Sequence, residues 1–343
     1  MYFDSHAHLD DPRFDADREE IFAALSKQGP VMNVGCDLPS SERSVALAHA
    51  YDFVYAAVGW HPEEWQSWNG ESMALLRSLC AQPKVVAIGE IGLDYYWDTE
   101  HKALQKEMFE RQLSLAIERK LPVIVHDREA HGDCLEIVMN YPEARGVFHC
   151  FSGSAEMAKE LIRRGWYLGF DGPVTYKSNK KAAEVLKGTN IMVLEDNPYG
   201  ELRFSGQAGH SFHWFLGEQC VMLGTFSKIV SPGMRIGWIA CKEPTVKEKL
   251  LAYKSTMDLH TNIFCQMVLA QYLADHDLDE HIEKTRVLYK AKAEKMHACM
   301  KKYFPDGVEY TQPEGGMFLW ATMPEGIKAV DVQNRAMERG VAV

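Results

Sequence analysis

The sequence predicts an α/β protein with two successive regions, and two observations support this. In residues 1–189, short apolar runs alternate with longer amphipathic segments, the pattern of repeated strand and helix units around a parallel sheet. Near residue 190 the pattern changes without a linker rich in Pro, Gly or Ser. The 343 residues, 46% of them apolar, are enough for one large domain with an appendage or for two domains.

The first region is expected to contain eight strands. The apolar runs are residues 2–6, 31–35, 53–59, 85–89, 122–126, 146–149, 166–170 and 191–194, the last being a segment of buried type. Helical patterns lie between them at residues 18–28, 42–51, 104–120 and 156–165. Eight strands alternating with helices predict a closed (β/α)₈ barrel, whose active site lies at the carboxyl ends of the strands.

Metal-binding residue types stand at these strand ends. They are His6 and His8 after the first strand, then Glu90, His126, His149 and Asp196. Strand side chains alternate, so His6 and His8 face one side and can grip one metal ion. Any one of these histidines is more often a packed or hydrogen-bonded core residue. Metal-binding residue types at the ends of five of the eight expected strands instead predict a metal site.

The same positions carry motifs that closely resemble the TatD family of metal-dependent hydrolases. The motifs are Asp-Ser-His-Ala-His-Leu-Asp at 4–10, Gly-Trp-His-Pro at 59–62, Gly-Glu-Ile-Gly-Leu-Asp-Tyr-Tyr at 89–96, His-Asp-Arg at 126–128, His-Cys-Phe-Ser-Gly-Ser at 149–154 and Gly-Phe-Asp-Gly-Pro at 169–173. The match is collinear from Met1 to about Lys187. The resemblance implies a TIM barrel with two divalent ions (Mg, Mn or Zn) that hydrolyses phosphodiesters, with DNA or a small phosphoester as substrate.

The resemblance also implies the roles of the metal-binding residues. His6 and His8 would hold one metal, Glu90 would bridge, His126 and His149 would hold the second, and Asp196 would complete the first. Glu90 and Asp196 would thereby be catalytic.

His61 and Arg128 lie on the same expected rim and are candidates for contacting substrate phosphate. Each has a plainer interpretation. The Gly-Trp-His-Pro segment around His61 could be only a strand-ending turn, and Arg128 could be only a partner for Asp127 or Glu129.

The chain departs from the TatD pattern at the last acid. The family has Glu-Thr-Asp-x-Pro-Tyr there, whereas this chain has the shorter run Glu195-Asp196-Asn197-Pro198-Tyr199. The preceding connection, residues 176–189, is also short for a helix and a loop. A one-residue slip of the eighth strand would turn Asp196 to the wrong face.

The second region carries a different lysine-centred pattern. An expected strand at residues 221–223 leads into a loop rich in Gly, Ser and Thr that contains Lys228, with an Arg seven residues further on. Such a loop suits a phosphate-bearing aldehyde cofactor, although most lysines in such loops are simply solvated.

The sequence around Lys228 resembles that of the class I/II, fold-type I aminotransferases, which use pyridoxal phosphate. The resemblance implies a partial three-layer α/β large-domain fragment with the start of the small domain, including helices at 245–253, 264–275 and 280–303. It implies that Asp196 pairs with the pyridine nitrogen, Tyr199 bonds the ring hydroxyl, Lys228 forms the Schiff base, and Thr225, Ser227 and Arg235 bind phosphate.

Several parts of a complete aminotransferase are missing from this sequence. Residues 1–189 supply no phosphate-anchoring glycine loop, no aromatic to stack on the ring and no Asn beside Asp196. The sequence stops at Val343, before the segment in which the family's Arg for the substrate carboxylate is expected. We therefore expect a hydrolase domain at residues 1–199 and an inactive aminotransferase fragment at 190–343, sharing the Asp196 strand.

Three hypotheses follow for the whole chain. The first is a metal-dependent phosphoesterase with an appendage, and it is favoured because its ligand set is complete or one residue short. The second is a pyridoxal-phosphate aminotransferase acting on an amino acid and a 2-oxo acid. The third is a chimera of two genes with no intact activity, joined at similar Glu-Asp-Pro-Tyr strands.

The composition limits which binding partners and which cellular compartment are expected for this protein. The net charge is −11 and residues 1–189 are the more acidic part, which argues against broad electrostatic capture of nucleic acid unless bound metal reverses the local field. Eight scattered cysteines without a Cys-x-x-Cys pair suit a reducing cytoplasm. The amino terminus lacks a signal-peptide pattern, and no apolar run approaches the roughly 20 residues of a membrane span. The oligomeric state is left open.

Overall fold

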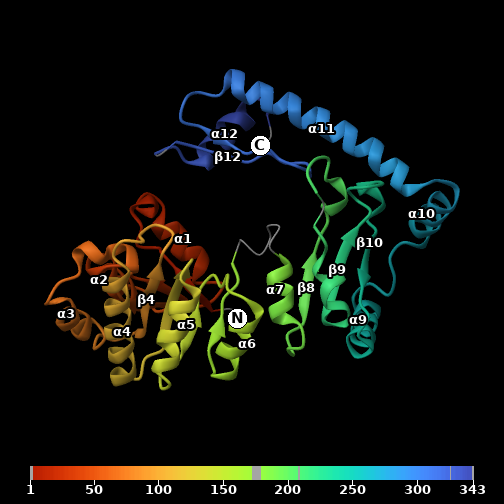
Figure 1. Cartoon of the computed structure of the whole chain (residues 1–343). Helices are drawn as coiled ribbons and strands as arrows, with labels where there is room; N and C mark the ends of the chain where they lie inside the picture. Colours follow the sequence, from red (N-terminus) through yellow and green to blue (C-terminus); the bar gives the residue numbers. More distant parts are fainter. Residues whose placement is uncertain (1–2, 172–178, 208, 325, 342–343) are drawn as a thin grey trace. The chain divides into compact units, whose positions relative to one another are not determined.

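The computed structural model describes residues 3–171, 179–207, 209–324 and 326–341. They form two compact units, Met1–Val185 and Leu186–Val343 (Figure 1). Residues 172 and 173 of the expected Gly-Phe-Asp-Gly-Pro motif, and residues 176–178 of the short connection, lie outside the described ranges.

The first unit contains a curled sheet of seven parallel strands in the sequential order β1 to β7. The strands are β1 Asp4–Ala7, β2 Val31–Val34, β3 Val54–Val58, β4 Val85–Asp94, β5 Val123–Arg128, β6 Gly146–Phe148 and β7 Tyr167–Leu168. Each coincides with an expected apolar run, although β4 continues five residues further. Sequential parallel order with a helix after most strands is the barrel type of α/β fold that the sequence predicts.

Helices alternate with these strands along the chain (Figure 1). They are α1 Arg18–Leu25, α2 Leu38–Ala50, α3 Ser72–Leu79, α4 Lys102–Arg119, α5 His131–Asn140, α6 Ala155–Arg163 and α7 Asn179–Leu186, with 3₁₀ turns at Pro12–Phe14 and Pro62–Ser67. The sequence interpretation did not include α3, α5 and α7, which are short and contain 8, 10 and 8 residues. The connection that was expected to be short for a helix and a loop thus does contain a helix, α7. Short helices gain most of their stability from packing rather than from local propensity, so their sequence pattern is weak.

The core of this unit lies between the strands and the helices. All four residues of β2 are buried, as are nine of the ten in β4, as expected for strands covered on both faces. Helix α4 adds the fully buried Phe109 and Leu113. Helix α2 begins with a capping box in which Asp37 accepts a bond from the Ser40 amide over 2.8 Å.

Two glycines allow close approach next to the strand ends. Gly92 has a φ of 145°, and a Cβ there would lie 2.0 Å from the carbonyl oxygen of His126. A Cβ on Gly146 would lie 1.9 Å from the carbonyl oxygen of Val123. Both positions therefore require glycine, and the first sets how closely β4 approaches the strand that carries His126.

The eighth strand is not where the sequence interpretation put it. The strand is β8 Val193–Asp196, and it pairs in parallel with β9 Cys220–Thr225, in a separate sheet of order β10-β9-β8. The expected strand at 191–194 is also not buried, because Ile191, Met192 and Leu194 are exposed. An apolar run can join any sheet with a free edge, and here the adjacent β9 provides one.

The second unit is built around this small sheet. Strand β10 Gly237–Ala240 pairs antiparallel with β9, and β11 Glu309–Tyr310 pairs with β12 Ala321–Thr322. The helices are α8 Phe212–Leu216, α9 Pro244–Met257, α10 Ile263–Asp275, α11 Leu278–Tyr303 and α12 Ala329–Glu338, with 3₁₀ turns at Gly200–Leu202, Gly217–Gln219 and Pro232–Met234. The expected helices at 245–253, 264–275 and 280–303 are confirmed as α9, α10 and α11.

No helix in the described ranges is both long and apolar enough to cross a membrane.

Candidate active site

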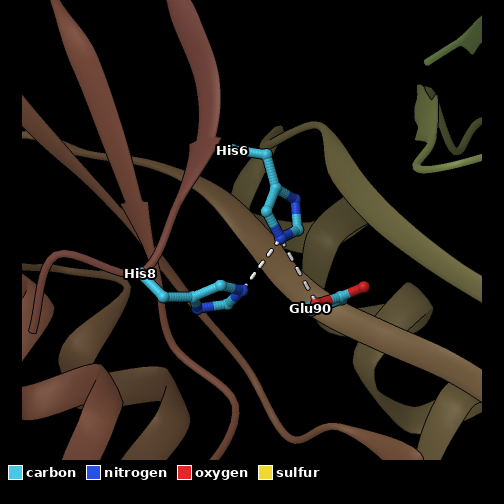
Figure 2. A group of neighbouring side chains, drawn as sticks. All are labelled: His6, His8 and Glu90. Carbon is cyan, nitrogen blue, oxygen red and sulfur yellow. Dashed lines mark hydrogen bonds and ion pairs between the residues drawn. The ribbon is translucent and has the colours of Figure 1, made fainter. Parts of the chain in front are cut away.

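His6 on β1 and His8, which comes directly after this strand, converge with Glu90 of β4. Nε2 of His6 lies 3.1 Å from Nε2 of His8 and 3.4 Å from a carboxylate oxygen of Glu90 (Figure 2). Glu90 is buried. Two imidazole nitrogens and a carboxylate oxygen within 4.8 Å of one another can bind one divalent ion.

The second nitrogen of His8 determines which atom is free to bind metal. Nδ1 of His8 lies 2.9 Å from the carbonyl oxygen of Val34, which can only accept, so this nitrogen donates. The neutral ring then carries its lone pair on Nε2, which faces His6 and lies near Glu90. The donor set thus fits a metal ion in both residue type and tautomer.

His126 on β5 lies between two carboxylates. Its Nδ1 is 3.1 Å from Oε1 of Glu90, and its Nε2 is 2.9 Å from Oδ2 of Asp94. Burial lowers the pKa of His126, but the two carboxylates outweigh burial and raise the pKa to about 9. Without a metal ion the ring is therefore protonated at neutral pH, and an ion binding one nitrogen must replace that proton.

The two carboxylates respond in the opposite direction. Burial raises the pKa of Glu90, but hydrogen bonds from His126 and His6 outweigh burial and hold the pKa well below its ordinary value. Burial likewise raises the pKa of Asp94, and the bond from His126 together with backbone amides more than reverses this. Both groups are therefore negatively charged at neutral pH, as metal ligands and their supporting residues must be.

His61 lies beside His126, with the two ring centroids 4.3 Å apart. Burial, followed by the nearby His126 charge, lowers the pKa of His61 to about 4. Nδ1 of His61 accepts a bond from the Glu63 amide over 3.2 Å, so the neutral ring carries its proton on Nε2. His61 can therefore offer a neutral N–H donor, but no positive charge, to a substrate.

His149 follows β6 and stacks on His6, with ring centroids 3.7 Å apart and an interplanar angle of 13°. Its Nδ1 lies 3.3 Å from Oδ2 of Asp171. Burial and the neighbouring His6 lower the pKa of His149, which favours the neutral His149 ring that a metal ligand requires.

A cavity of about 530 Å³ opens beside these histidines within the first unit. It is lined by His126, Arg128, His149, Asp171 and Lys181, among others. The ammonium group of Lys181 donates to the Ser152 carbonyl over 3.5 Å. Two cationic side chains around a cavity at a carboxylate and histidine cluster suit a phosphate-bearing substrate.

The structure brings together five of the predicted metal ligands with His61 and Arg128, whereas Asp196 belongs to the second unit, on β8. Sequence reasoning missed Asp94, Asp171 and Lys181 as site residues. Asp94 could have been suspected, because it ends the Gly-Glu-Ile-Gly-Leu-Asp run on the strand that carries Glu90. Lys181 lies on α7 without a local motif of its own.

The residues expected to bind pyridoxal phosphate lie in the second unit. The amide of Ser227 donates to the Thr225 hydroxyl over 3.1 Å, and the Lys228 ammonium lies 5.6 Å from the centroid of the Tyr199 ring. Arg235 adopts the left-handed region with φ of 55°. In this loop Lys228 therefore lies beside Tyr199, and Ser227 lies beside Thr225.

Comparison with known proteins finds two families along the chain. The TatD related DNase family matches residues 3–213, and the class I and II aminotransferase family matches residues 175–343. The uncharacterized metal-dependent hydrolase YabD of Bacillus subtilis is 42% identical over 206 residues, which are 58% of this chain and 81% of that protein. The 3'-5' ssDNA/RNA exonuclease TatD of Cronobacter turicensis is 34% identical over 205 residues, or 57% of this chain and 78% of that protein.

The part of the chain that matches the aminotransferase family is similar to a different known protein. Aromatic-amino-acid aminotransferase 1 of Thermococcus litoralis is 43% identical over 167 residues, which are 48% of this chain but only 40% of that protein. The chain therefore spans less than half the length of this aminotransferase. Among solved structures, YJJV, a TatD homolog from Escherichia coli K12, matches with a TM-score of 0.52 and 29% identity, covering 64% of this chain and 90% of its own. The chain belongs to the TatD related DNase family, as a metal-dependent hydrolase acting on ester bonds, and carries a class I and II aminotransferase region after it.

Proposed function

We propose that the first unit hydrolyses phosphodiesters, in DNA or in a small phosphoester, with two divalent ions. The observation that supports this most directly is the convergence of the His6 and His8 Nε2 atoms with Glu90. His6 and His8 would hold one ion, Glu90 would bridge, and His126 and His149 would hold the other. Asp196, an exposed carboxylate on β8, is the proposed sixth ligand, in a hydrolase domain of residues 1–199 that shares this strand with an aminotransferase region of 190–343.

The metal type follows from the donors. Four imidazoles suit Zn²⁺ better than Mg²⁺, which prefers oxygen ligands, while Mn²⁺ accepts both kinds. When bound, such ions polarise a phosphoryl oxygen and supply hydroxide at neutral pH.

Side chains of the protein would bind the substrate phosphate and orient the metal ligands. The Arg128 guanidinium can bind two phosphate oxygens, and the Lys181 ammonium adds a second positive charge on the wall of the same cavity. The neutral His61 ring can donate its Nε2 proton in a hydrogen bond to a phosphate oxygen while staying uncharged. Asp94 would hold the His126 ring in one orientation.

A metal-dependence assay tests this proposal. The full chain, stripped with chelator, would be given bis(p-nitrophenyl) phosphate and then Zn²⁺, Mn²⁺ or Mg²⁺ in separate reactions. We expect hydrolysis with at least one ion and its loss on renewed chelation. In the His6→Ala/His8→Ala variant we expect the rate of hydrolysis to fall by more than about 100-fold, because the metal-centred catalysis would be removed. Full activity of that variant would remove the two-metal proposal.

We also propose that the aminotransferase region is catalytically inactive and that the chain is a chimera in origin. The two family matches overlap at residues 175–213, and residues 1–185 form a unit of a different fold from the one an aminotransferase would need there. Sequencing independent source DNA across the codons for residues 187–190 tests the origin. A natural uninterrupted sequence through these codons would show that the fusion exists outside a cloning product.

A further inference from the structure

An aromatic pair stands next to the metal-binding cluster and has no role in the site described so far. Tyr96 and Trp97 lie just after β4, separated from it by Tyr95, and are 54% and 62% exposed. Their ring centroids lie 4.8 Å apart with an interplanar angle of 85°. Two large exposed aromatic side chains in succession cost hydrophobic free energy unless something covers them.

The backbone of this pair is held rigidly. Oδ1 of Asp94 accepts hydrogen bonds from the amides of both Tyr96 and Trp97, each over 2.9 Å. Oδ2 of the same carboxylate faces Nε2 of His126 over 2.9 Å. One fully buried carboxylate therefore fixes both the aromatic pair and a candidate metal ligand.

Arg128 connects the pair to the cavity. The carbon of its guanidinium group lies 4.1 Å from the centroid of the Tyr96 ring and 5.4 Å from that of Trp97. The same residue lines the 530 Å³ cavity beside His126. A guanidinium packed on aromatic rings is oriented for bonds in its own plane, so it can bind phosphate at its edge while the aromatic surface stays next to it.

We propose that Tyr96 and Trp97, steadied by Arg128, form a stacking subsite for the nucleobase next to the phosphodiester bound at the metal cluster. The occupant must combine a flat π-face with a phosphate, and a nucleotide in a strand has both. A sugar ring alone could also lie on Trp97, but an abasic strand retains the sugars and phosphates and so separates the two cases. This subsite rests on the proposed function and adds a base-dependent contribution to substrate binding.

Binding rather than turnover tests the subsite. Fluorescein-labelled hexathymidylate and a matched hexamer of abasic tetrahydrofuran sites would be titrated with the full chain in chelator, with anisotropy as the readout. Stacking typically changes affinity by roughly 10-fold to 100-fold per base, so we expect the normal hexamer to bind at least about 10-fold more tightly than the abasic one. We expect the Tyr96→Ala/Trp97→Ala variant to bring this ratio close to one and Trp97→Phe to retain most of it. The ratio is measured within each variant, so partial unfolding that lowers both affinities does not imitate the effect.

A matched control is available in the same unit. Tyr167 on β7 is also exposed, and Tyr167→Ala should leave the ratio unchanged. Equal binding of the two hexamers by the unsubstituted chain, or an unchanged ratio in the double variant, would overturn the subsite. Hydrolysis of bis(p-nitrophenyl) phosphate is a separate readout. A base-dependent ratio without any metal-dependent hydrolysis would retain the subsite and reject the proposed hydrolase function.

Discussion

Oδ2 of Asp94 lies 2.9 Å from Nε2 of His126, while Nδ1 of the same ring lies 3.1 Å from Glu90. Both carboxylates accept only, so without metal each ring nitrogen carries a proton. An ion that binds Nδ1 beside Glu90 would replace the proton there, while Asp94 keeps the proton on Nε2. Carboxylates placed in this way behind a histidine fix its tautomer and raise its basicity.

Replacing Asp94 by Asn should weaken metal binding. The amide can no longer stabilise the Nε2 proton with a charge, so we expect metal affinity to fall by about 10-fold to 100-fold. Isothermal titration of the stripped protein with Zn²⁺ or Mn²⁺ measures this. Asp98→Asn is the matched control, because Asp98 follows the same strand but bonds to His101 and the backbone of residues 100 and 101. Equal affinities for the Asp94 variant and the unsubstituted chain would assign Asp94 a purely structural role.

A second carboxylate supports a pH-dependent prediction away from the cluster. Oδ2 of Asp133 accepts the Tyr95 hydroxyl over 2.6 Å and the Lys106 ammonium over 2.7 Å, and these bonds, that of Lys106 first, lower the pKa of Asp133. A carboxylate with a lowered folded pKa contributes stability above its unfolded pKa of roughly 3.9 and loses it as pH falls through the folded value.

The Asp133→Asn variant should therefore be less stable at pH 7, by about 0.5–1 kcal/mol given that the side chain is one-third exposed. The difference should shrink once the pH falls below about 4. Hydrogen exchange of the α5 amides, compared between the two proteins at each pH, reports on the first unit alone. A difference that stays constant down to pH 2.5 would show that the charge of Asp133 contributes nothing.

Limited proteolysis should attack the second unit first. Among the described residues, α9 and α12 contain no buried residue and α10 contains only Leu269, whereas the first unit has a continuous core. Chymotrypsin should cut near Tyr253 and Phe264, which are 66% and 74% exposed, because local opening there costs little. Mass spectrometry should show a lasting fragment that contains residues 1–185. A resistant fragment from the second unit, with the first digested, would be the opposite result.

The chain should show no transamination. Lys228 lies beside Tyr199, but catalysis also needs a ring held by a stacked aromatic and a clamped substrate carboxylate, and each lost positioning contact can cost about 100-fold. Added pyridoxal phosphate can react with any accessible lysine amine, so we expect only the aldimine absorption band that such a non-catalytic reaction gives. Amino transfer to a 2-oxo acid should stay at background. Catalytic transfer that disappears in Lys228→Ala would show that the aminotransferase region is functional.

Much of the first unit could be predicted from local sequence. The run at 31–35 gives β2 because a strand buried on both faces is mostly apolar, and Asn33, its one polar residue, is hydrogen-bonded to Asp10 and Ser44. Likewise, His6, Glu90 and His126 could be grouped from the sequence, because the carboxyl ends of parallel strands meet at one edge of the sheet. The resemblance to TatD proteins rests on these same positions, and the family match supports it.

The contacts around the site could not be predicted in this way. The register of β4 against β5 pairs Gly92 with His126 and Asp94 with Arg128, and this register places the Asp94 carboxylate on the His126 ring. Local sequence does not encode the partner of a backbone hydrogen bond. For that reason Asp94, and the aromatic pair that it holds, were not recognised as part of the site.

The sequence by itself predicted a buried strand at residues 191–194 followed by an acidic pair, and it resembled two families in which such a segment has a role. The strand is instead β8, Val193–Asp196, and it is not buried. Only the tertiary structure decided the partner of that strand, which is β9. The physical reason is that an apolar strand pairs through its backbone, which is nearly the same in every strand. The choice therefore depends on which sheet edge is available and on the side chains that pack around it.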